Sequence, residues 1–174
     1  MVLAARALVA ESGPAALTMR ALADHLGIKA PSLYKHFPDK AAVEAEVIAL
    51  GLLATAEALE AAEERFARAS GEPGEGRPAS ILEALAEAYR ADALARPHLY
   101  LLATERPLPR HALPEGLEAR AALPLMRACA FDEARARALW AFAHGMVSLE
   151  IHGRFPQDAD LPAAWTAGVR ALER

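Results

Sequence analysis

The sequence predicts an all-α, nine-helix, two-part fold, with a small three-helix N-terminal bundle followed by a larger C-terminal helical part. Composition is the first observation behind this prediction. Of the 174 residues 54% are hydrophobic, Val and Ile are scarce, and the abundant Ala, Leu, Glu and Arg favour helices. Apolar residues also recur at helical spacing, and no segment shows the alternation of a strand. Finally, Gly and Pro fall at intervals that suit helix ends.

The three N-terminal helices are short, and local signals bound each of them. The first covers 2–12 and ends at Gly13-Pro14, with an inward face expected at Leu3, Ala7, Leu8 and Ala10. Thr18 suits the N-cap of a second helix, 19–26, which Gly27 ends. Pro31 suits the first turn of a third helix, 31–37, because a missing N–H costs nothing there.

Six further helices are expected to follow. Asp39 caps the first of them, and the Gly- and Pro-rich stretch 70–78 then separates two helices rather than two domains. A second irregular stretch covers 104–116. The predicted ranges are 40–68, 79–95, 97–105, 115–129, 132–153 and 160–172.

Charge and cysteine content limit the class of protein. The formal net charge is −4, which argues against a general nucleic-acid coat protein, although residues 1–40 hold five Lys and Arg against three Asp and Glu. Cys129 is the only cysteine, so no intrachain disulfide is possible and a reducing compartment is expected. No apolar run approaches the roughly 18 residues of a membrane span. We therefore expect a cytoplasmic protein without a membrane contact or an export signal.

All three lysines, Lys29, Lys35 and Lys40, lie in one twelve-residue window that closes a helix-turn-helix pattern. Small and apolar residues pack its two helices together, and Gly27 tolerates the tight turn. The second helix then presents neutral or cationic donors, Ser32, Tyr34, Lys35 and His36, with no acid among them. Such a surface suits the DNA backbone and base edges.

Residues 17–40 closely resemble the DNA-binding signature of TetR-type (tetracycline-repressor-like) transcriptional regulators. The matching residues are Leu17, Thr18, Arg20, Leu22, Ala23, Leu26, Gly27, Ser32, Leu33, Tyr34, His36, Phe37 and Lys40, with Pro31 also matching the founding member. The resemblance implies a DNA-binding domain over 1–45 and a ligand-binding and dimerisation domain over 46–174. It also implies a homodimer that binds a palindromic double-stranded operator.

The resemblance assigns roles residue by residue. Thr18, Tyr34 and Lys40 are implied to hold phosphates, and the groove-facing set is Arg20, Ala30, Pro31, Ser32 and His36. Lys29 in the turn adds a further cationic contact. Lys35 stands where many relatives have an aromatic residue or His, which either shifts base preference or adds a phosphate contact. The sequence begins almost directly at the first helix, so the basic N-terminal arm of many relatives is not expected, which weakens the prediction of a flanking minor-groove contact.

Purely structural roles stay open as alternatives for the aromatic residues of this segment. Tyr34 is either a phosphate contact or a core aromatic, and His36 either contacts a base or is simply exposed. Phe37 shares a helical face with Leu33 and is therefore expected in the core.

In the C-terminal half, residues 140–150 contain a Trp-x3-His-Gly element and are similar to a subgroup of TetR-type regulators; 89–100 is similar to the matching region. This resemblance implies that the helix 132–153 lines both a ligand cavity and the dimer interface. The predicted pocket residues are Tyr100, Trp140, His144 and Val147. The predicted interface residues are Leu139, Phe142, Met146, Leu149, Trp165 and Val169.

His144 has an ordinary alternative, because a lone His on an apolar helical face is more often a satisfied core group than a ligand contact. Gly145 in mid-helix costs about 1 kcal/mol relative to Ala, which suggests close approach of another helix. His144, Glu150 and His152 do not share one helical face, so no metal site is predicted, and no cofactor is expected.

The function predicted from these features is a ligand-responsive transcriptional regulator, most simply a repressor released by a small, largely apolar molecule. An all-helical enzyme using His144 or His111 is the first rival, but no catalytic set of residues can be identified, so we expect no enzyme. The second rival is a helical protein-interaction module that contains a helix-turn-helix without binding DNA sequence-specifically. Salt-sensitive retention on heparin would favour DNA binding over that module.

Overall fold

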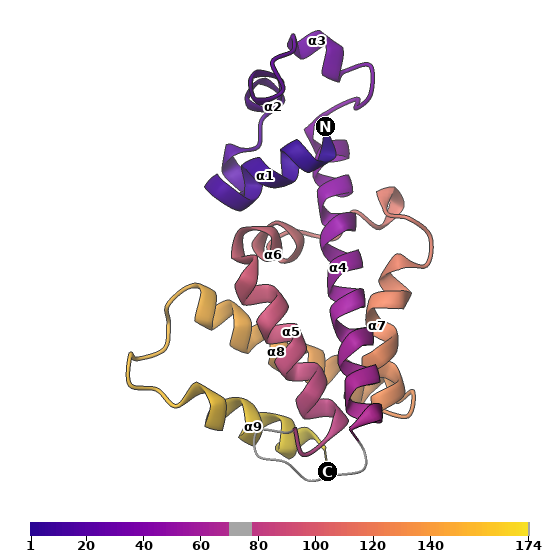
Figure 1. Cartoon of the computed structure of the whole chain (residues 1–174), viewed down its shortest axis with the longest axis vertical. Coiled ribbons are helices and arrows are strands. Elements are labelled where there is room, and N and C mark those ends of the chain that lie inside the picture. Colours follow the sequence, from indigo (N-terminus) through magenta and orange to yellow (C-terminus); the bar gives the residue numbers. More distant parts are fainter. Residues whose placement is uncertain (70–77, 174) are drawn as a thin grey trace. The chain divides into compact units, whose positions relative to one another are not determined.

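The computed structural model describes residues 1–69 and 78–173 (Figure 1). Helices account for every regular element in these ranges. They are α1 (Val2–Ser12), η1 (Pro14–Ala16), α2 (Met19–His25), α3 (Ala30–Leu33), α4 (Lys40–Arg68), α5 (Ile81–Ala95), α6 (Pro97–Thr104), η2 (Arg110–Ala112), α7 (Leu117–Ala128), α8 (Glu133–Ile151) and α9 (Leu161–Leu172). This confirms the all-α prediction. The predicted stretch 70–78 lies outside the described residues except for Pro78.

The chain forms two compact units, and neither is continuous in sequence. The first unit comprises residues 1–54 and 96–118, and the second comprises 55–95 and 119–174. α4 therefore begins in the first unit and ends in the second. The domain boundary predicted after residue 45 left residues 96–118 in the C-terminal domain. Only long-range contacts assign that segment to the first unit, so the sequence pattern gave no sign of it.

The first unit has one apolar core, to which α1, α2, α3, the start of α4 and α6 all contribute. Its fully or almost fully buried residues are Ala5, Val9, Leu17, Leu22, Ala23, Leu33, Val43, Val47, Ile48, Leu99 and Leu102. His98 on α6 adds a polar link, since its Nδ1 lies 2.9 Å from the carbonyl oxygen of Ala10 and donates a hydrogen bond to it. Segments far apart in sequence thus support the helix-turn-helix.

The inward face of α1 differs from the predicted one. Ala5 and Val9 are completely buried, whereas Leu3 and Ala10 are exposed. Ala7 and Leu8 are half-buried. Ala5 and Val9 are four residues apart and therefore lie on the same face of α1, which packs against α2 and α6. The helix is thus rotated relative to the prediction, in which Leu3 pointed inward.

α3 is shorter than the predicted 31–37. Its α-helical residues end at Leu33, after which the His36 N–H donates to the Leu33 carbonyl at 2.9 Å in a tight turn. Phe37 precedes Pro38, and the residue before a proline is disfavoured in the helical conformation. The helix therefore cannot continue to Phe37, although 34–36 still follow it as a turn.

The second unit is built from α5, α7, α8, α9 and the end of α4. Two neighbouring clusters form its core: Leu82, Cys129, Ala136, Leu139 and Val169, and Leu59, Ala62 and Leu85. Phe142 of α8 packs against Gly168 of α9, where an added Cβ would overlap the Phe142 ring. Gly145, where we expected a close approach, has no neighbour within 4 Å of such a Cβ.

None of the helices in the described ranges is both long and apolar enough to cross a membrane.

Candidate nucleic-acid interface

Thr18 fixes the start of α2 and remains able to donate. Its side-chain oxygen accepts a hydrogen bond from the Ala21 N–H at 3.0 Å, which confirms the predicted N-cap. The hydroxyl hydrogen is not used by this bond, so it can still reach an anion. Arg20, in the first turn of α2, is almost fully exposed and lies 3.9 Å from the Asp24 carboxylate, a contact at the limit of an ion pair.

The turn between α2 and α3 depends on Gly27. Its φ of 65° lies in the left-handed region, and the N–H of Ile28 donates to the Ala23 carbonyl at 3.0 Å, which closes the end of α2. An added Cβ at Gly27 would meet nothing within 4 Å, so conformation and not crowding requires glycine here. The turn leaves Lys29 exposed beside it.

α3 and the turn after it are anchored on one side and open on the other. Leu33 is completely buried and Phe37 packs against the same core, which confirms the core prediction for Phe37. The predicted contact residues lie on the other side: Pro31, Tyr34, Lys35 and His36 are exposed, and Ala30 and Ser32 are partly exposed. Tyr34 is 54% exposed, so the alternative that placed it in the core is wrong.

The start of α4 places Lys40 at the edge of this surface. Asp39 caps the helix by accepting from the Ala42 N–H at 2.9 Å, as predicted. The Lys40 ammonium lies 3.2 Å from the Glu44 carboxylate, one turn along α4. Arg106, which follows α6, reaches the same carboxylate at 3.4 Å. Sequence analysis missed Glu44 and Arg106; the four-residue spacing from Lys40 signals the first, but nothing local signals the second.

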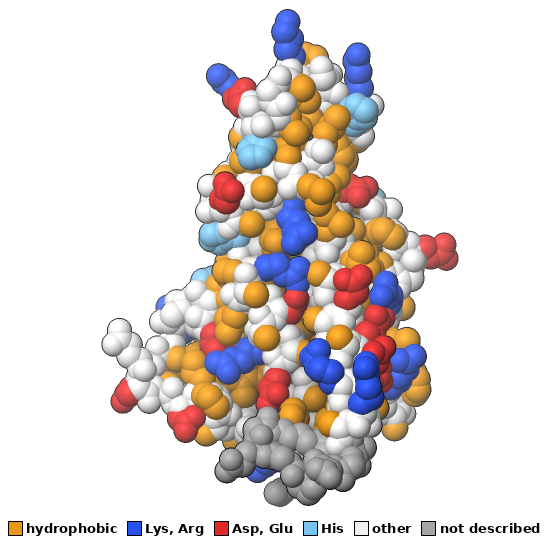
Figure 2. Space-filling model, viewed as in Figure 1, with side chains coloured by type: hydrophobic (Ala, Val, Ile, Leu, Met, Phe, Trp, Pro, Cys, Tyr) orange, Lys and Arg blue, Asp and Glu red, His pale blue; other side chains and the backbone are white. Residues whose placement is uncertain are grey.

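The predicted interface residues thus belong to consecutive elements of the first unit: α2 with its N-cap, the turn, α3 with the turn after it, and the start of α4. Figure 2 shows Lys and Arg side chains that project separately from the surface around α2 and α3, with apolar side chains between them. Arg20, Lys29 and Lys35 are exposed and Lys40 is partly exposed. This arrangement can bind a polyanion, and its polar side chains can contact base edges.

The four predicted pocket residues divide between the two units. Tyr100 belongs to the first unit, and Trp140, His144 and Val147 belong to the second. Trp140 is 52% exposed and stacks on His144, with ring centroids 5.8 Å apart, whereas Val147 is completely buried in the core. On α8 the predicted face is thus divided, with Trp140 at the surface and Val147 in the core, and the pocket set stays a prediction.

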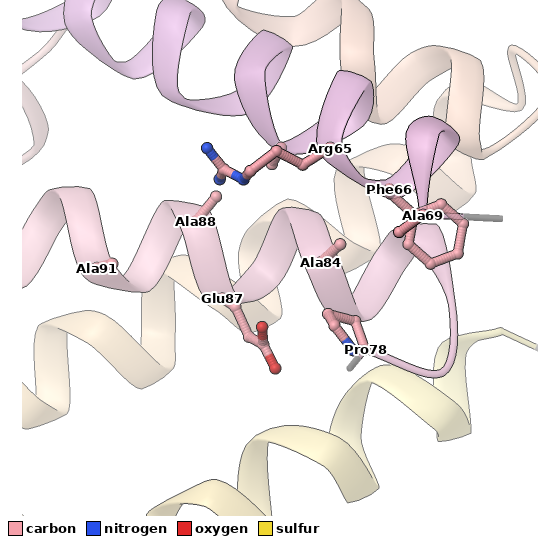
Figure 3. A pocket seen from close by; sticks show the side chains of 9 residues that line it. Arg65, Phe66, Ala69, Pro78, Ala84, Glu87, Ala88 and Ala91 are labelled. Carbon is pink, nitrogen blue, oxygen red and sulfur yellow. The ribbon is translucent and has the colours of Figure 1, made fainter. Parts of the chain in front are cut away.

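A different pocket lies between the end of α4 and α5, in the second unit (Figure 3). It has a volume of about 420 Å³ and is lined by Ala62, Arg65, Phe66, Ala69, Pro78, Ala84, Glu87, Ala88 and Ala91. Small apolar side chains thus form most of the wall, and one cation and one acid stand in it. Burial raises the pKa of Glu87, and the negative charge of Glu83 raises it further.

Three of the six predicted dimer-interface residues, Leu139, Trp165 and Val169, lie in the core of the second unit. Buried side chains have almost no surface to lose on association, so these three are reassigned to the core. Phe142 and Met146 are half-buried, and Leu149 is 42% exposed. Leu149 therefore remains the most accessible of the predicted set.

A mostly buried ionic cluster ties α5, α8 and α9 together. Arg90 donates three hydrogen bonds to the Glu150 carboxylate at 2.6 to 3.0 Å, and the Trp165 indole N–H donates a fourth at 2.7 Å. The Arg90 guanidinium also lies 5.8 Å from the centre of the Trp165 ring. Glu150, considered above as a metal ligand, is instead fully used by protein donors. In the described ranges no three His, Cys, Asp or Glu side chains gather as a metal site requires.

Similarity to known proteins agrees with this architecture. Residues 2–47 match the family model of bacterial regulatory proteins of the TetR family, and residues 82–172 match that of the tetracycline-repressor-like C-terminal domain. Comparison with curated protein sequences finds no match. The subgroup with the Trp-x3-His-Gly element stays a prediction.

Three solved structures resemble the chain over 98% of its length. SCO4313, named as a candidate regulatory protein, is 26% identical with a TM-score of 0.73 and 92% of its own chain covered. A Rhodococcus sp. RHA1 protein of unknown function is 22% identical, with a TM-score of 0.74 and 90% covered. A TetR from Acinetobacter baumannii AYE is 24% identical, with a TM-score of 0.56 and 91% covered. The last two show the shared fold, and together with the family models that match both halves of the sequence, they lead to one conclusion: the chain belongs to the TetR family of DNA-binding transcription regulators.

Proposed function

We propose that this regulator is a homodimeric repressor that a small, largely apolar effector releases from a palindromic operator. The observation that carries the proposal is the open side of α3 and its following turn. There Ser32, Lys35 and His36 are accessible while Leu33 holds the segment on the core. A short helix presented in this way suits the major groove.

The flanks of α3 support a division of labour between base and backbone contacts. Thr18 and Lys40 stand at helix starts on either side of it, where a hydroxyl and an ammonium can each bind a phosphate. In this proposal Tyr34 also binds phosphate, while Arg20, Ala30, Pro31, Ser32 and His36 face the groove. Lys29 and Lys35 add positive charge.

Two copies of the chain are needed to bind a palindrome. The surface proposed for their association is the accessible side of α8 and α9, with Leu149 and Trp140 as its large exposed apolar side chains. Exposed alanines of α9, such as Ala163 and Ala167, leave room for close helix packing. The two recognition segments of the dimer would then contact half-sites about 34 Å apart, one turn of DNA.

The proposed effector site is the pocket between α4 and α5. Its alanines, Phe66 and Pro78 suit an apolar molecule, and Arg65 and Glu87 offer one charged contact each. Arg65 and Phe66 belong to α4, the helix that also carries Lys40 at its start. An effector that favours one position of α4 would therefore alter DNA affinity, typically by about 1–3 kcal/mol.

The direct test is selection of bound fragments from genomic DNA, followed by measurement of affinity for the recovered sequence. We expect enrichment of one inverted repeat. Recovery of all fragments in proportion to their abundance would contradict the proposal.

Lys40→Ala tests the backbone contact separately. Binding should weaken alike on selected and unrelated duplexes, and the salt slope should become shallower by about one per subunit, because one phosphate contact is lost. Lys40→Arg is the control that keeps the charge. A change of sequence preference without a general loss of affinity would contradict the phosphate role.

A further inference from the structure

The Glu44 carboxylate is shared between two cations of the first unit. The Lys40 ammonium lies 3.2 Å from one of its oxygens, and an Arg106 guanidinium nitrogen lies 3.4 Å from both. The second distance is at the long end of hydrogen bonding, so Arg106 is the looser partner. The Glu44 side chain is only 13% exposed, whereas that of Arg106 is 59% exposed.

This geometry creates competition for Lys40. A carboxylate with little access to water is costly without a cationic partner. When Lys40 moves toward a phosphate, Glu44 loses its nearer cation. The cost of that move depends on whether a second cation remains, and Arg106 is positioned to remain.

Arg106 connects the Lys40–Glu44 ion pair to α6, a helix distant from both residues in sequence. It lies two residues beyond the end of α6, whose Leu99 and Leu102 are part of the first unit's core. The His98 bond to Ala10 also fixes α6 to α1. A displacement of α6 would therefore move the second cation relative to Glu44.

We propose that Glu44 is a positioning residue that restrains Lys40, and that Arg106 releases Lys40 for the DNA backbone by taking over the Glu44 carboxylate. This deepens the proposed function and rests on it, because it presupposes that Lys40 binds a phosphate. Arg106 acts on DNA affinity through Glu44, without touching the DNA.

A double-mutant cycle tests the assignment. Glu44→Gln, Arg106→Gln and the double variant are compared with the unaltered protein by fluorescence anisotropy on the selected duplex and on an unrelated one. Glu44→Gln should tighten binding to both duplexes about threefold per subunit, the size of a partly exposed ion pair. Arg106→Gln should weaken binding by a similar factor, and in the Glu44→Gln background it should have no further effect.

Arg110→Gln is the matched control. Arg110 follows Arg106 by four residues, is exposed, and pairs with Glu118 at 2.8 Å instead of with Glu44. Its replacement removes the same charge from the same segment, so it should leave DNA affinity unchanged. An equal loss in Arg110→Gln and Arg106→Gln would mean a general charge effect and would overturn the proposal.

Two other results would also overturn the proposal. The first is an unchanged or weaker DNA affinity in Glu44→Gln. The second is an Arg106→Gln effect that is just as large in the Glu44→Gln background, because Arg106 would then contact DNA directly. Thermal unfolding shows whether each variant folds. Should Glu44→Gln unfold, Glu44→Asp replaces it, and its shortened reach to Lys40 should still tighten binding; no tightening counts against the proposal. These outcomes leave the proposed function standing if the unaltered protein binds selectively and Lys40→Ala weakens it. Without any selective binding, both fail.

Discussion

Glu150→Ala should destabilise the second unit more than any replacement of a surface acid. Glu150 is only 6% exposed and accepts four hydrogen bonds, three from Arg90 and one from the Trp165 indole. Its removal leaves the indole N–H without an acceptor and Arg90 without its counter-ion. Breaking a buried pair costs about 3–5 kcal/mol. Arg90 is about one-quarter exposed and can turn toward water, so we expect about 3 kcal/mol.

The assay is urea and thermal unfolding followed by far-UV circular dichroism, at one fixed protein concentration because association would shift the midpoint. A loss of about 3 kcal/mol corresponds to a decrease of roughly 6–12 °C in the melting temperature for a chain of this size. Trp165→Phe keeps an aromatic ring and leaves the Arg90–Glu150 pair intact, although it removes the N–H donor and part of the ring volume, so its effect should be smaller.

Glu64→Ala is the control, because Glu64 pairs with Arg68 on the exposed surface of α4 at 2.6 Å. Exposed pairs of this kind contribute little to stability. If Glu150→Ala were no more destabilising than Glu64→Ala, the cluster would not hold α5, α8 and α9 together.

Three further predictions concern packing, assembly and the pocket. Gly168→Ala should destabilise the protein, because overpacking against the Phe142 ring costs about 1–3 kcal/mol, which should outweigh the gain in helix propensity of about 1 kcal/mol. Chemical denaturation measures the loss of stability. In a Phe142→Leu background the loss should be smaller. Leu149→Arg should reduce the mass in light scattering from two chains to one with unchanged helix content, and a persistent dimer would exclude this face. Ala88→Phe should fill the pocket and abolish release from DNA by any effector that acts on the unaltered protein; retained release would place the effector elsewhere.

Local signals explain why the helix bounds could be predicted so closely. Thr18 and Asp39 cap the helices they precede, and Gly27 ends α2 with a positive φ, each through contacts within a few residues. The exposed side of α3 was predictable for a similar reason, because Leu33 and Phe37 define its buried side. Pro38 shortened α3 through a local effect that the prediction did not weigh.

Long-range choices of partner could not be predicted. Leu139 and Val169 are apolar residues at helical spacing, and that pattern does not distinguish a core face from an interface between subunits. The contact of Arg106 with Glu44 joins residues 62 positions apart, and no local feature announces it. The pocket escaped prediction because alanines, which form most of its wall, carry no chemical signature.

Every function proposed above requires that the surface of the first unit formed by α2, α3 and the start of α4 recognises a DNA sequence. The most direct measurement is the ratio of dissociation constants for the selected duplex and for a duplex of the same composition in shuffled order, at two salt concentrations. We expect at least a thousandfold preference for the selected duplex and a steep weakening of both complexes with salt. Equal affinity for the two duplexes would mean that this surface does not recognise a sequence.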